Sequence, residues 1–334
     1  DALFDVLRTL TKKGIGIVYV SHHMSEIFRI SDRITVLRDG RRISTLPASE
    51  TSQEQVVAEM IGGGHPGDVD RSNNVGKDEV LKVQNLSHPS EFQDISFSIR
   101  AGEIVGMAGL MGARRSEIVR SIVGLLQGSE GEIEFEGKSV RFGSLRQAMR
   151  AGVGFVPEER KTEGLFLEQS LSDNLIAASL SDHSSNGVMR KRSIRASSRS
   201  AIDAFSVKAS SIDDPVSDLS GGNQQKIMLA KWLKRTPKLL IIEEPTKGVD
   251  VGAKFQIHTE LLQCAAAGMA ILIVSSDFPE LVSLSSRILV VHEGRLMGNV
   301  DAAAATEETL LQLAAGVPNS STNNPHSNQA GAST

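Results

Sequence analysis

The chain of 334 residues holds a single cysteine, Cys264, which excludes an internal disulfide and any metal site built on several cysteines. Aromatic residues make up only 4%, which argues against base-stacking platforms for nucleic acids. The net charge of -4 does not favour a surface that coats nucleic acid either. No apolar run approaches the roughly 18–20 residues needed to cross a bilayer. The remaining composition, 40% apolar and 23% charged, is typical of one or two globular domains with a sizeable core.

An internal repeat indicates how the chain is organised. Residues 14–43 align without a gap to residues 268–297, an offset of 254 (268 − 14), and 11 of the 30 positions are identical. Each copy predicts a β-branched strand, a Ser-containing turn, a short helix, a second strand and a Gly turn. Two unrelated strand–helix–strand units are the alternative, but they would not keep Ser, Glu, Ser, Arg, Gly and Arg in step.

Composition divides the chain around this repeat. Residues 1–61 are expected to be the C-terminal part of a first domain, because the sequence opens on Asp1 within an amphipathic helix pattern. If each copy closes a domain of equal size, about 175 residues are missing before Asp1. Residues 62–79, rich in Gly, Asp and Asn, predict a linker. Residues 80–316 predict one complete α/β domain, and the polar residues 317–334 predict a disordered tail.

Residues 102–117, GEIVGMAGLMGARRSE, predict a strand, a Gly-containing loop and a helix start. This is the frame of a phosphate-binding loop, in which backbone N–H groups and a helix N-terminus face an anion. Gly109 and Ser116 fit the pattern GxxxxGK[ST], but Arg114 replaces the second Gly and Arg115 replaces the Lys. Arg is not equivalent to Lys in a narrow cradle, and Arg114 adds bulk where the backbone must approach phosphate. The loop alone is therefore weak support for nucleotide contact.

Residues 219–226, LSGGNQQK, form a more specific motif. Ser220 is expected to cap the helix that starts here, and Gly221 and Gly222 allow a phosphate to approach its N-terminal N–H groups. The alternative is an ordinary Ser-Gly-Gly helix cap, which is common in proteins. The motif that follows makes this alternative less attractive.

Residues 239–250, LLIIEEPTKGVD, predict an apolar strand that ends in two carboxylates. A carboxylate at this position can hold Mg²⁺, here Glu243, and the next one, Glu244, can polarise an attacking water. The alternative is a solvated acidic turn. The order of phosphate loop, Ser-Gly-Gly helix and acidic strand end favours the functional interpretation.

Together these motifs resemble the ATP-binding subunits of ABC transporters, and the resemblance extends from Asp1 to about Gly316. The sequence is most similar to the fused double-ATPase subunits of bacterial carbohydrate importers, the ribose, galactose and xylose group. The second half of such subunits carries Arg in the Lys position and VPE-x-R-K in place of the Gln loop, which Arg115 and residues 156–161 match. The resemblance implies an α/β fold, an ABC-type P-loop NTPase domain with a mixed sheet, an antiparallel β subdomain and a helical subdomain. It also implies that the C-terminal piece of a second such domain precedes it.

In this family two ATPase halves close face to face, and each ATP lies between the phosphate loop of one half and the signature motif of the other. The resemblance implies that Ser220, Gly221, Gly222 and Gln224 clamp the ATP of the first half. His22 matches the switch histidine that contacts the γ-phosphate, although an ordinary surface histidine is the alternative. The implied ligands are ATP and Mg²⁺. The implied site comprises Glu244 and His22 as catalytic residues, Gly109, Gly112, Arg115, Ser116, Ser220, Gly221, Gly222, Gln224 and Asp250 for nucleotide, and Ser116 and Glu243 for metal.

The two ATP sites are expected to differ. The site that uses the second half's own loop departs from the family pattern at Arg114, Arg115, Glu243 and Ser276, which stands where the repeat places His22. We expect this site to bind ATP weakly or hydrolyse it poorly. The other site needs a phosphate loop and an acidic strand end from the missing first half, so the fragment alone is not expected to be a competent ATPase.

The resemblance also implies partners and a location. Expected partners are membrane permease subunits, the missing first ATPase half and, indirectly, a periplasmic sugar-binding protein, with no nucleic acid. The expected location is peripheral, on the cytoplasmic face of the bacterial inner membrane. Residues 165–175 would surround the surface that receives the permease, and the basic residues 190–199 predict a solvated helix face. A nucleoside importer, a non-transport ABC ATPase and a non-hydrolysing regulatory module are the alternatives.

Overall fold

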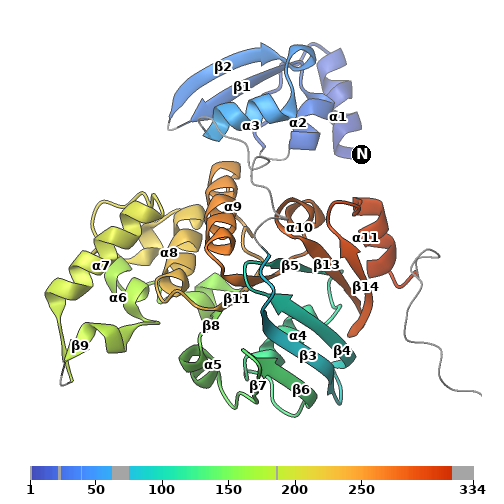
Figure 1. Cartoon of the computed structure of the whole chain (residues 1–334). Helices are drawn as coiled ribbons and strands as arrows, with labels where there is room; N and C mark the ends of the chain where they lie inside the picture. The colour runs from blue at the N-terminus through green and yellow to red at the C-terminus, as the bar shows by residue number, and fades with distance from the viewer. Residues whose placement is uncertain (1, 22–23, 39, 62–74, 186, 318–334) are drawn as a thin grey trace, which may run out of the picture.

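The structure is a computed structural model that describes residues 2–21, 24–38, 40–61, 75–185 and 187–317. His22, residues 62–74 of the predicted linker and residues 318–334 of the predicted tail lie outside the described residues. A small N-terminal unit stands apart from a larger α/β unit, which it approaches where α3 lies beside α9 (Figure 1).

The N-terminal unit combines helices with an antiparallel hairpin. Its small core brings Ile34 and Val36 of the hairpin against Val56, with Phe28 and Met60 packed around them. Its elements are α1 (Ala2–Lys12), α2 (Met24–Ile30), β1 (Arg33–Arg38), β2 (Arg41–Pro47), η1 (Ala48–Glu50) and α3 (Gln53–Ile61).

The elements of this unit recur at the end of the chain. Helix α2 and strands β1 and β2 begin and end 254 residues before α10 (Phe278–Leu284), β13 (Arg287–His292) and β14 (Arg295–Asp301). The hairpin turns agree as well, since Gly40 and Gly294 have φ values of +73° and +74°, a conformation that favours glycine. The repeat in the sequence is therefore matched by a repeat in structure.

One element of the first copy is not formed. The sequence predicts a strand near residues 15–20, but the structure assigns no secondary structure there, and Val18 and Val20 are 92% and 91% exposed. The matching strand of the second copy, β12 (Ala270–Val274), is paired on both sides, by β5 and β11. A strand depends on such neighbours for its backbone hydrogen bonds. The prediction was wrong because no described strand pairs with residues 15–20.

The larger unit is built on a sheet in the order β14-β13-β5-β12-β11-β8, in which only the edge strand β14 is antiparallel. Its inner strands are apolar along their length and buried, as expected when both faces of a parallel sheet are covered. The strands not yet located are β5 (Ile104–Ala108), β8 (Val153–Val156) and β11 (Leu239–Glu243). The mixed sheet confirms the predicted fold class.

An antiparallel sheet in the order β4-β3-β6-β7 packs on one side of this sheet and shares a hydrophobic core with it. Ile95 and Ile99 of β4 are fully buried in that core, together with Ile118 and Ile122 of α4. The elements on this side are β3 (Glu79–His88), β4 (Phe92–Arg100), α4 (Arg115–Ile122), β6 (Glu130–Phe135), β7 (Lys138–Ser139) and α5 (Leu145–Ala151).

A helical part projects from the other side of the sheet (Figure 1). Helix α8 is almost entirely buried and holds this part to the sheet, while the basic face of α7 is largely exposed, as predicted for residues 190–199. The elements are η3 (Arg160–Gly164), α6 (Leu171–Ile176), η4 (Leu180–His183), β9 (Ser184–Ser185), β10 (Val188–Met189), α7 (Lys191–Ala204), η5 (Val216–Asp218) and α8 (Gly221–Leu233).

The remaining helices, α9 (Val251–Ala266) and α11 (Glu307–Ala314), complete the unit. The parallel strands β5, β11 and β12 end at the same edge of the sheet, which brings together the loops that follow them. Among the described residues, no helix is long and apolar enough to span a bilayer.

Candidate functional site

The loop after β5 adopts a tight conformation that its glycines explain. A Cβ atom on the buried Gly109 would lie 2.6 Å from the Val291 carbonyl oxygen, so no side chain fits there. Gly112 has φ +83°. Arg114, directly before α4, has φ +73° and keeps the left-handed backbone that Gly adopts without strain. The loop therefore has backbone conformations suited to glycine at both positions, although Arg114 has replaced one of the glycines.

The two arginines of the loop point to different partners. Arg114 is half exposed and forms ion pairs with Glu91 at 3.0 Å and with Glu117 at 3.3 Å. The Arg115 side chain is 12% exposed, and its Nη2 lies 3.7 Å from Glu244 Oε1. Its Nη1 is buried and has no hydrogen-bond partner. A buried guanidinium donor without a partner suits an anion, so the loop fits a phosphate group in chemistry as well as in shape.

Glu243, the last residue of β11, is fully buried. Its Oε2 accepts a hydrogen bond from the Glu158 N–H at 3.3 Å and lies 3.6 Å from Arg120 Nη2. Burial raises the pKa of this carboxyl, while a hydrogen bond from the Ser116 hydroxyl and the charge of Arg120 oppose the rise. The predicted metal ligands Ser116 and Glu243 thus lie together.

The surroundings of Glu243 do not suit a magnesium ion as they stand. Mg²⁺ requires octahedral oxygen ligands and usually keeps several waters, but Glu243 has no solvent-exposed surface. A guanidinium already neutralises one carboxylate oxygen and would repel a second cation. Among the described residues, no group of three or more His, Cys, Asp or Glu side chains could hold a metal. The other carboxylate oxygen, Glu243 Oε1, is buried and has no hydrogen-bond partner, so it stays available to a ligand that reaches it.

Arg120 was not identified from the sequence. It lies on α4 four residues after Ser116, a spacing that places both side chains on one face of the helix. Its Nη2 lies 2.7 Å from Glu163 Oε2 as well as near Glu243. The helical spacing after the phosphate loop was the one signal that could have revealed it.

Glu244 is held in one orientation by the loop after β12. Its Oε1 accepts the Ser276 N–H at 2.8 Å, and the Ser275 hydroxyl lies 3.3 Å from its Oε2. Burial raises the pKa of Glu244, and the hydrogen bonds from Ser276 and the charge of Arg115 oppose the rise. Because Ser276 stands where the first copy has His22, the imidazole predicted for the first copy has no counterpart here.

The second cluster of predicted residues lies at the N-terminus of α8. Ser220 is the exposed N-cap residue, although its hydroxyl accepts a hydrogen bond from the Asn223 side chain at 3.0 Å rather than from a backbone N–H. A Cβ atom on Gly222 would lie 2.7 Å from the Ala253 Cβ, so this glycine is required by packing against α9. The tip itself stays accessible, and an exposed helix N-terminus favours an anion.

Two further predicted residues contact this tip or its neighbours. Gln224 is buried, and its amide nitrogen donates to the carbonyl oxygens of Val216 and Leu219. Its side chain therefore hydrogen-bonds to the preceding loop and does not face solvent. The exposed Asp250 caps α9 by accepting the Ala253 N–H at 2.9 Å. The signature-like residues and Asp250 therefore form one cluster, whereas the phosphate loop and the two glutamates form the other.

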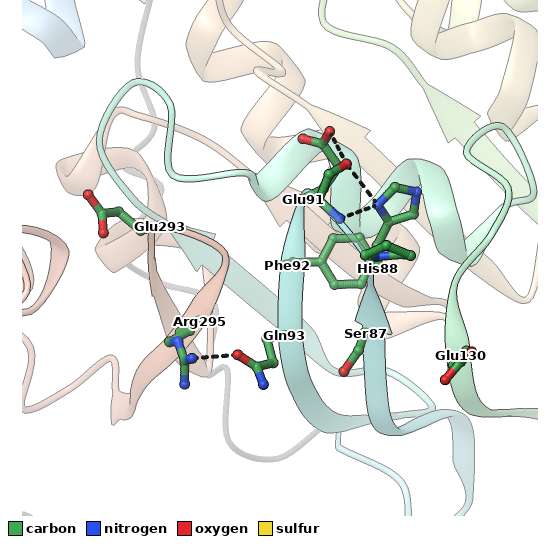
Figure 2. A pocket seen from close by; sticks show the side chains of 10 residues that line it. Ser87, His88, Glu91, Phe92, Gln93, Glu130, Glu293 and Arg295 are labelled. Carbon is green, nitrogen blue, oxygen red and sulfur yellow. Dashed lines mark hydrogen bonds between the residues drawn. The ribbon is translucent and has the colours of Figure 1, made fainter.

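A cavity of about 550 Å³, lined by residues 87–93 together with Glu130, Glu293 and Arg295, was not expected from the sequence. Glu91, the partner of Arg114, is one of its lining residues. The His88 ring lies 5.9 Å from the Phe92 ring, and Arg295 donates to Gln93 on the opposite wall (Figure 2). The cavity therefore combines ring surfaces with charged groups beside a loop that suits phosphate.

Comparison with known proteins agrees with this geometry. The family model for the ABC transporter matches residues 92–247. The chain is 42% identical over 316 residues to the ribose import ATP-binding protein RbsA of Lactococcus lactis subsp. cremoris (strain SK11), and 42% identical over 318 residues to RbsA of Bacillus subtilis (strain 168). A putative ribose/galactose/methyl galactoside import ATP-binding protein of Geobacillus kaustophilus is 40% identical over 315 residues. These matches cover 94–95% of this chain but only 62–64% of each relative.

Solved structures share the fold. An ATP-binding cassette of an ABC transporter, MJ1267 in its ADP conformation, covers 71% of the chain with a TM-score of 0.59 and 19% identity. The ATP-binding cassette MJ0796, bound to ADP and Pi, covers 66% with a TM-score of 0.58 and 19% identity. Residues 92–247, which include the phosphate loop and the acidic strand end, therefore match the ABC transporter family model, and the large unit shares its fold with ATP-binding cassettes.

Proposed function

We propose that this chain is part of the ATP-binding subunit of an importer that moves a monosaccharide across the bacterial inner membrane. The tip of α8 carries the proposal, because its N-cap residue Ser220 is exposed at a helix N-terminus, which favours an anion, while the buried Gly222 packs against α9. Relatives named as ribose import proteins support a sugar as the cargo. The subunit would sit peripherally at the cytoplasmic face and act on membrane permease subunits, with a periplasmic sugar-binding protein as an indirect partner.

In the proposed mechanism the tip of α8 completes an ATP site whose phosphate loop belongs to a second ABC ATP-binding domain. Ser220 and the N–H groups of Gly221 and Gly222 would contact the γ-phosphate when the two domains close. His22 would reach the same phosphate from the N-terminal unit. Preorganised donors of this kind stabilise the charge that develops during phosphoryl transfer. Closure would then drive the permease, and hydrolysis would reopen the pair.

The domain's own phosphate loop is proposed to be the weaker site. Arg115 forms an ion pair with Glu244, the carboxylate that would have to polarise the attacking water. Position 276, where the first copy of the repeat has His22, is a serine and provides no imidazole. Arg120 lies 3.6 Å from Oε2 of Glu243, the carboxylate predicted to hold Mg²⁺. Mg²⁺, which offsets phosphate charge in ATP hydrolysis, is proposed to act at the composite site, on ligands of the second domain.

Two substitutions in the assembled transporter test this division. Glu244→Gln should leave most ATP hydrolysis intact, because turnover belongs to the composite site. Ser220→Trp should abolish hydrolysis at saturating ATP, because a bulky side chain blocks the tip. Equal loss of activity in both variants would show that the two sites are not divided in this way. An unchanged rate in Ser220→Trp would refute the proposed function itself.

A non-hydrolysing regulatory module is the second candidate, and the Arg115–Glu244 pair favours it. In such a module this domain would bind no nucleotide at its own phosphate loop, whereas in the first candidate that loop binds ATP weakly. Titration of this chain with ATP distinguishes the two, since unmeasurable affinity favours the regulatory module. A nucleoside importer would differ from the first candidate only in its cargo.

A further inference from the structure

Arg160 occupies a position where three segments of the large unit meet. It follows β8 at the start of η3, and its Nη1 donates to the Lys247 carbonyl oxygen at 3.1 Å, in the loop after β11. Its Nη2 lies 3.0 Å from the position that a Cβ atom on Gly221 would take, at the tip of α8, and 3.6 Å from the corresponding position on Gly248. One guanidinium thus contacts the loop after β11 and lies against the tip of α8.

The two glycines are close to each other as well as to Arg160. A Cβ atom on Gly221 would lie 3.0 Å from the Gly248 carbonyl oxygen, and Gly248 has φ +67°. A side chain at position 221 would therefore push against both the arginine and the neighbouring loop. The absence of a side chain at Gly221 serves this internal contact in addition to the approach of phosphate.

A second set of contacts joins this region to the acidic end of β11. Lys247 Nζ lies 2.8 Å from Glu158 Oε1 and 2.9 Å from Glu159 Oε1. The N–H of Glu158 in turn donates to Glu243 Oε2. Lys247 is half exposed, so these ion pairs add little stability on their own, but they hold the loop after β11 beside the segment that follows β8.

We propose that Arg160 is a positioning residue that holds the tip of α8 in a fixed position against the loop after β11. The inference rests on the proposed function, because the tip matters only if it completes an ATP site on a second domain. A planar guanidinium suits this role, since it can donate at its edge and pack flat against two glycines. Through Glu158 the same segment also contacts Glu243, so a change at this domain's own phosphate site would reach the tip that serves the other site.

Hydrogen exchange on this chain tests the positioning role directly. In Arg160→Gln, exchange of the backbone N–H groups of residues 224–226 and of Lys247 and Val249 should accelerate about tenfold or more, because a charge-assisted hydrogen bond is lost. Exchange in β5 and β12 should stay unchanged. Arg195→Gln is the matched control, because it removes an exposed arginine paired with Asp213 elsewhere on the helical part. Unchanged exchange at the tip, or acceleration throughout the sheet, would overturn the proposal.

A second measurement uses the assembled transporter and separates this inference from the proposed function. Arg160→Gln should lower the ATP turnover number about tenfold per folded molecule, with the KM for ATP changed less than about twofold, because ATP is bound by the other domain's loop before the tip closes. Arg195→Gln should match the wild type. Full turnover in Arg160→Gln would overturn the positioning role. No turnover in the wild-type transporter would instead refute the proposed function, and the exchange result would remain a separate test of the contact.

Discussion

Repairing the phosphate loop is a direct test of the proposal that this domain's own site is weak. The change is Arg114→Gly together with Arg115→Lys, which restores the pattern GxxxxGK[ST] from Gly109 to Ser116. The backbone at position 114 already has φ +73°, so glycine fits without any movement of the loop. Lysine would replace a planar guanidinium with a point charge that fits a narrow cradle.

The cost and the gain can be worked out from the contacts of the two arginines. A non-glycine residue in the left-handed region costs about 1–2 kcal/mol, which the glycine relieves. The same change removes the ion pairs of Arg114 with Glu91 and Glu117, and exposed pairs of this kind contribute about 0–1 kcal/mol each. The change at position 114 should therefore lie between a loss of about 1 kcal/mol and a gain of about 2 kcal/mol in stability, so the variant should stay folded and a large change in nucleotide affinity reflects the site.

Fluorescence titration with a labelled ATP analogue on this chain measures the result. The double variant should bind at least about tenfold more tightly than the wild type, equivalent to about 1.4 kcal/mol, because the loop N–H groups are unblocked and the cation no longer pairs with Glu244. Arg114→Gly alone should give part of the gain. Equal affinity of wild type and double variant, with both folded by circular dichroism, would refute the view that these two residues weaken the site.

Three further substitutions test the interior of the domain. Arg120→Met should lower the free energy of unfolding by about 3 kcal/mol at pH 7, because it leaves the buried Glu243 without its charge partner, and the loss measured by urea denaturation should shrink at acid pH as the raised pKa of Glu243 allows protonation. Glu280→Gln should lower the free energy of unfolding by about 2 kcal/mol at pH 7, because hydrogen bonds to neighbouring side chains, His258 among them, hold the pKa of this carboxyl below its ordinary value. That contribution disappears as the pH falls through the lowered pKa, so the stabilities of wild type and variant should converge in thermal unfolding at acid pH. A difference that stays constant with pH would contradict the assignment. Gly222→Ala should cost about 1–3 kcal/mol by overpacking against the first turn of α9, whereas Gly16→Ala, with open space around it, should be nearly neutral in the same urea assay.

Much of the scaffold was predictable because it depends on patterns that are local in the sequence. An apolar strand at the start of residues 239–250 and a β-branched strand at the start of residues 268–297 were predicted, and the corresponding strands β11 and β12 both lie inside the parallel sheet. The phosphate loop and the acidic strand end were predicted from residue order, and the sheet brings them together through the Arg115–Glu244 pair. Motif spacing sufficed here because consecutive parallel strands end at one edge of a sheet.

Other features depend on contacts between distant residues and could not be predicted from one sequence. Arg160 contacts Lys247 across 87 residues, and Arg120 contacts Glu163 across 43. Gln224 was assigned to ATP from its motif, but only packing reveals that its amide is used by the preceding loop. The unformed strand near residues 15–20 follows the same rule, because its apolar pattern needs neighbouring strands that no described residue provides.

The contrast between the two clusters gives the asymmetry a physical cause. Near the phosphate loop, two arginines are already paired with carboxylates. Arg115, which could face a nucleotide, pairs with Glu244, and Arg120, which could stand near the nucleotide's metal, pairs with Glu243. Arg115 Nη1 is still free to meet an anion, but any movement of either guanidinium toward a nucleotide would weaken a largely buried ion pair, which a Lys-containing loop with an open metal position would not require. At the tip of α8 no such rearrangement is needed, since Ser220 is exposed and Gly222 and the Arg160 contacts already fix the helix end. These contacts support the proposal that the domain completes a site for ATP held elsewhere and holds ATP poorly itself.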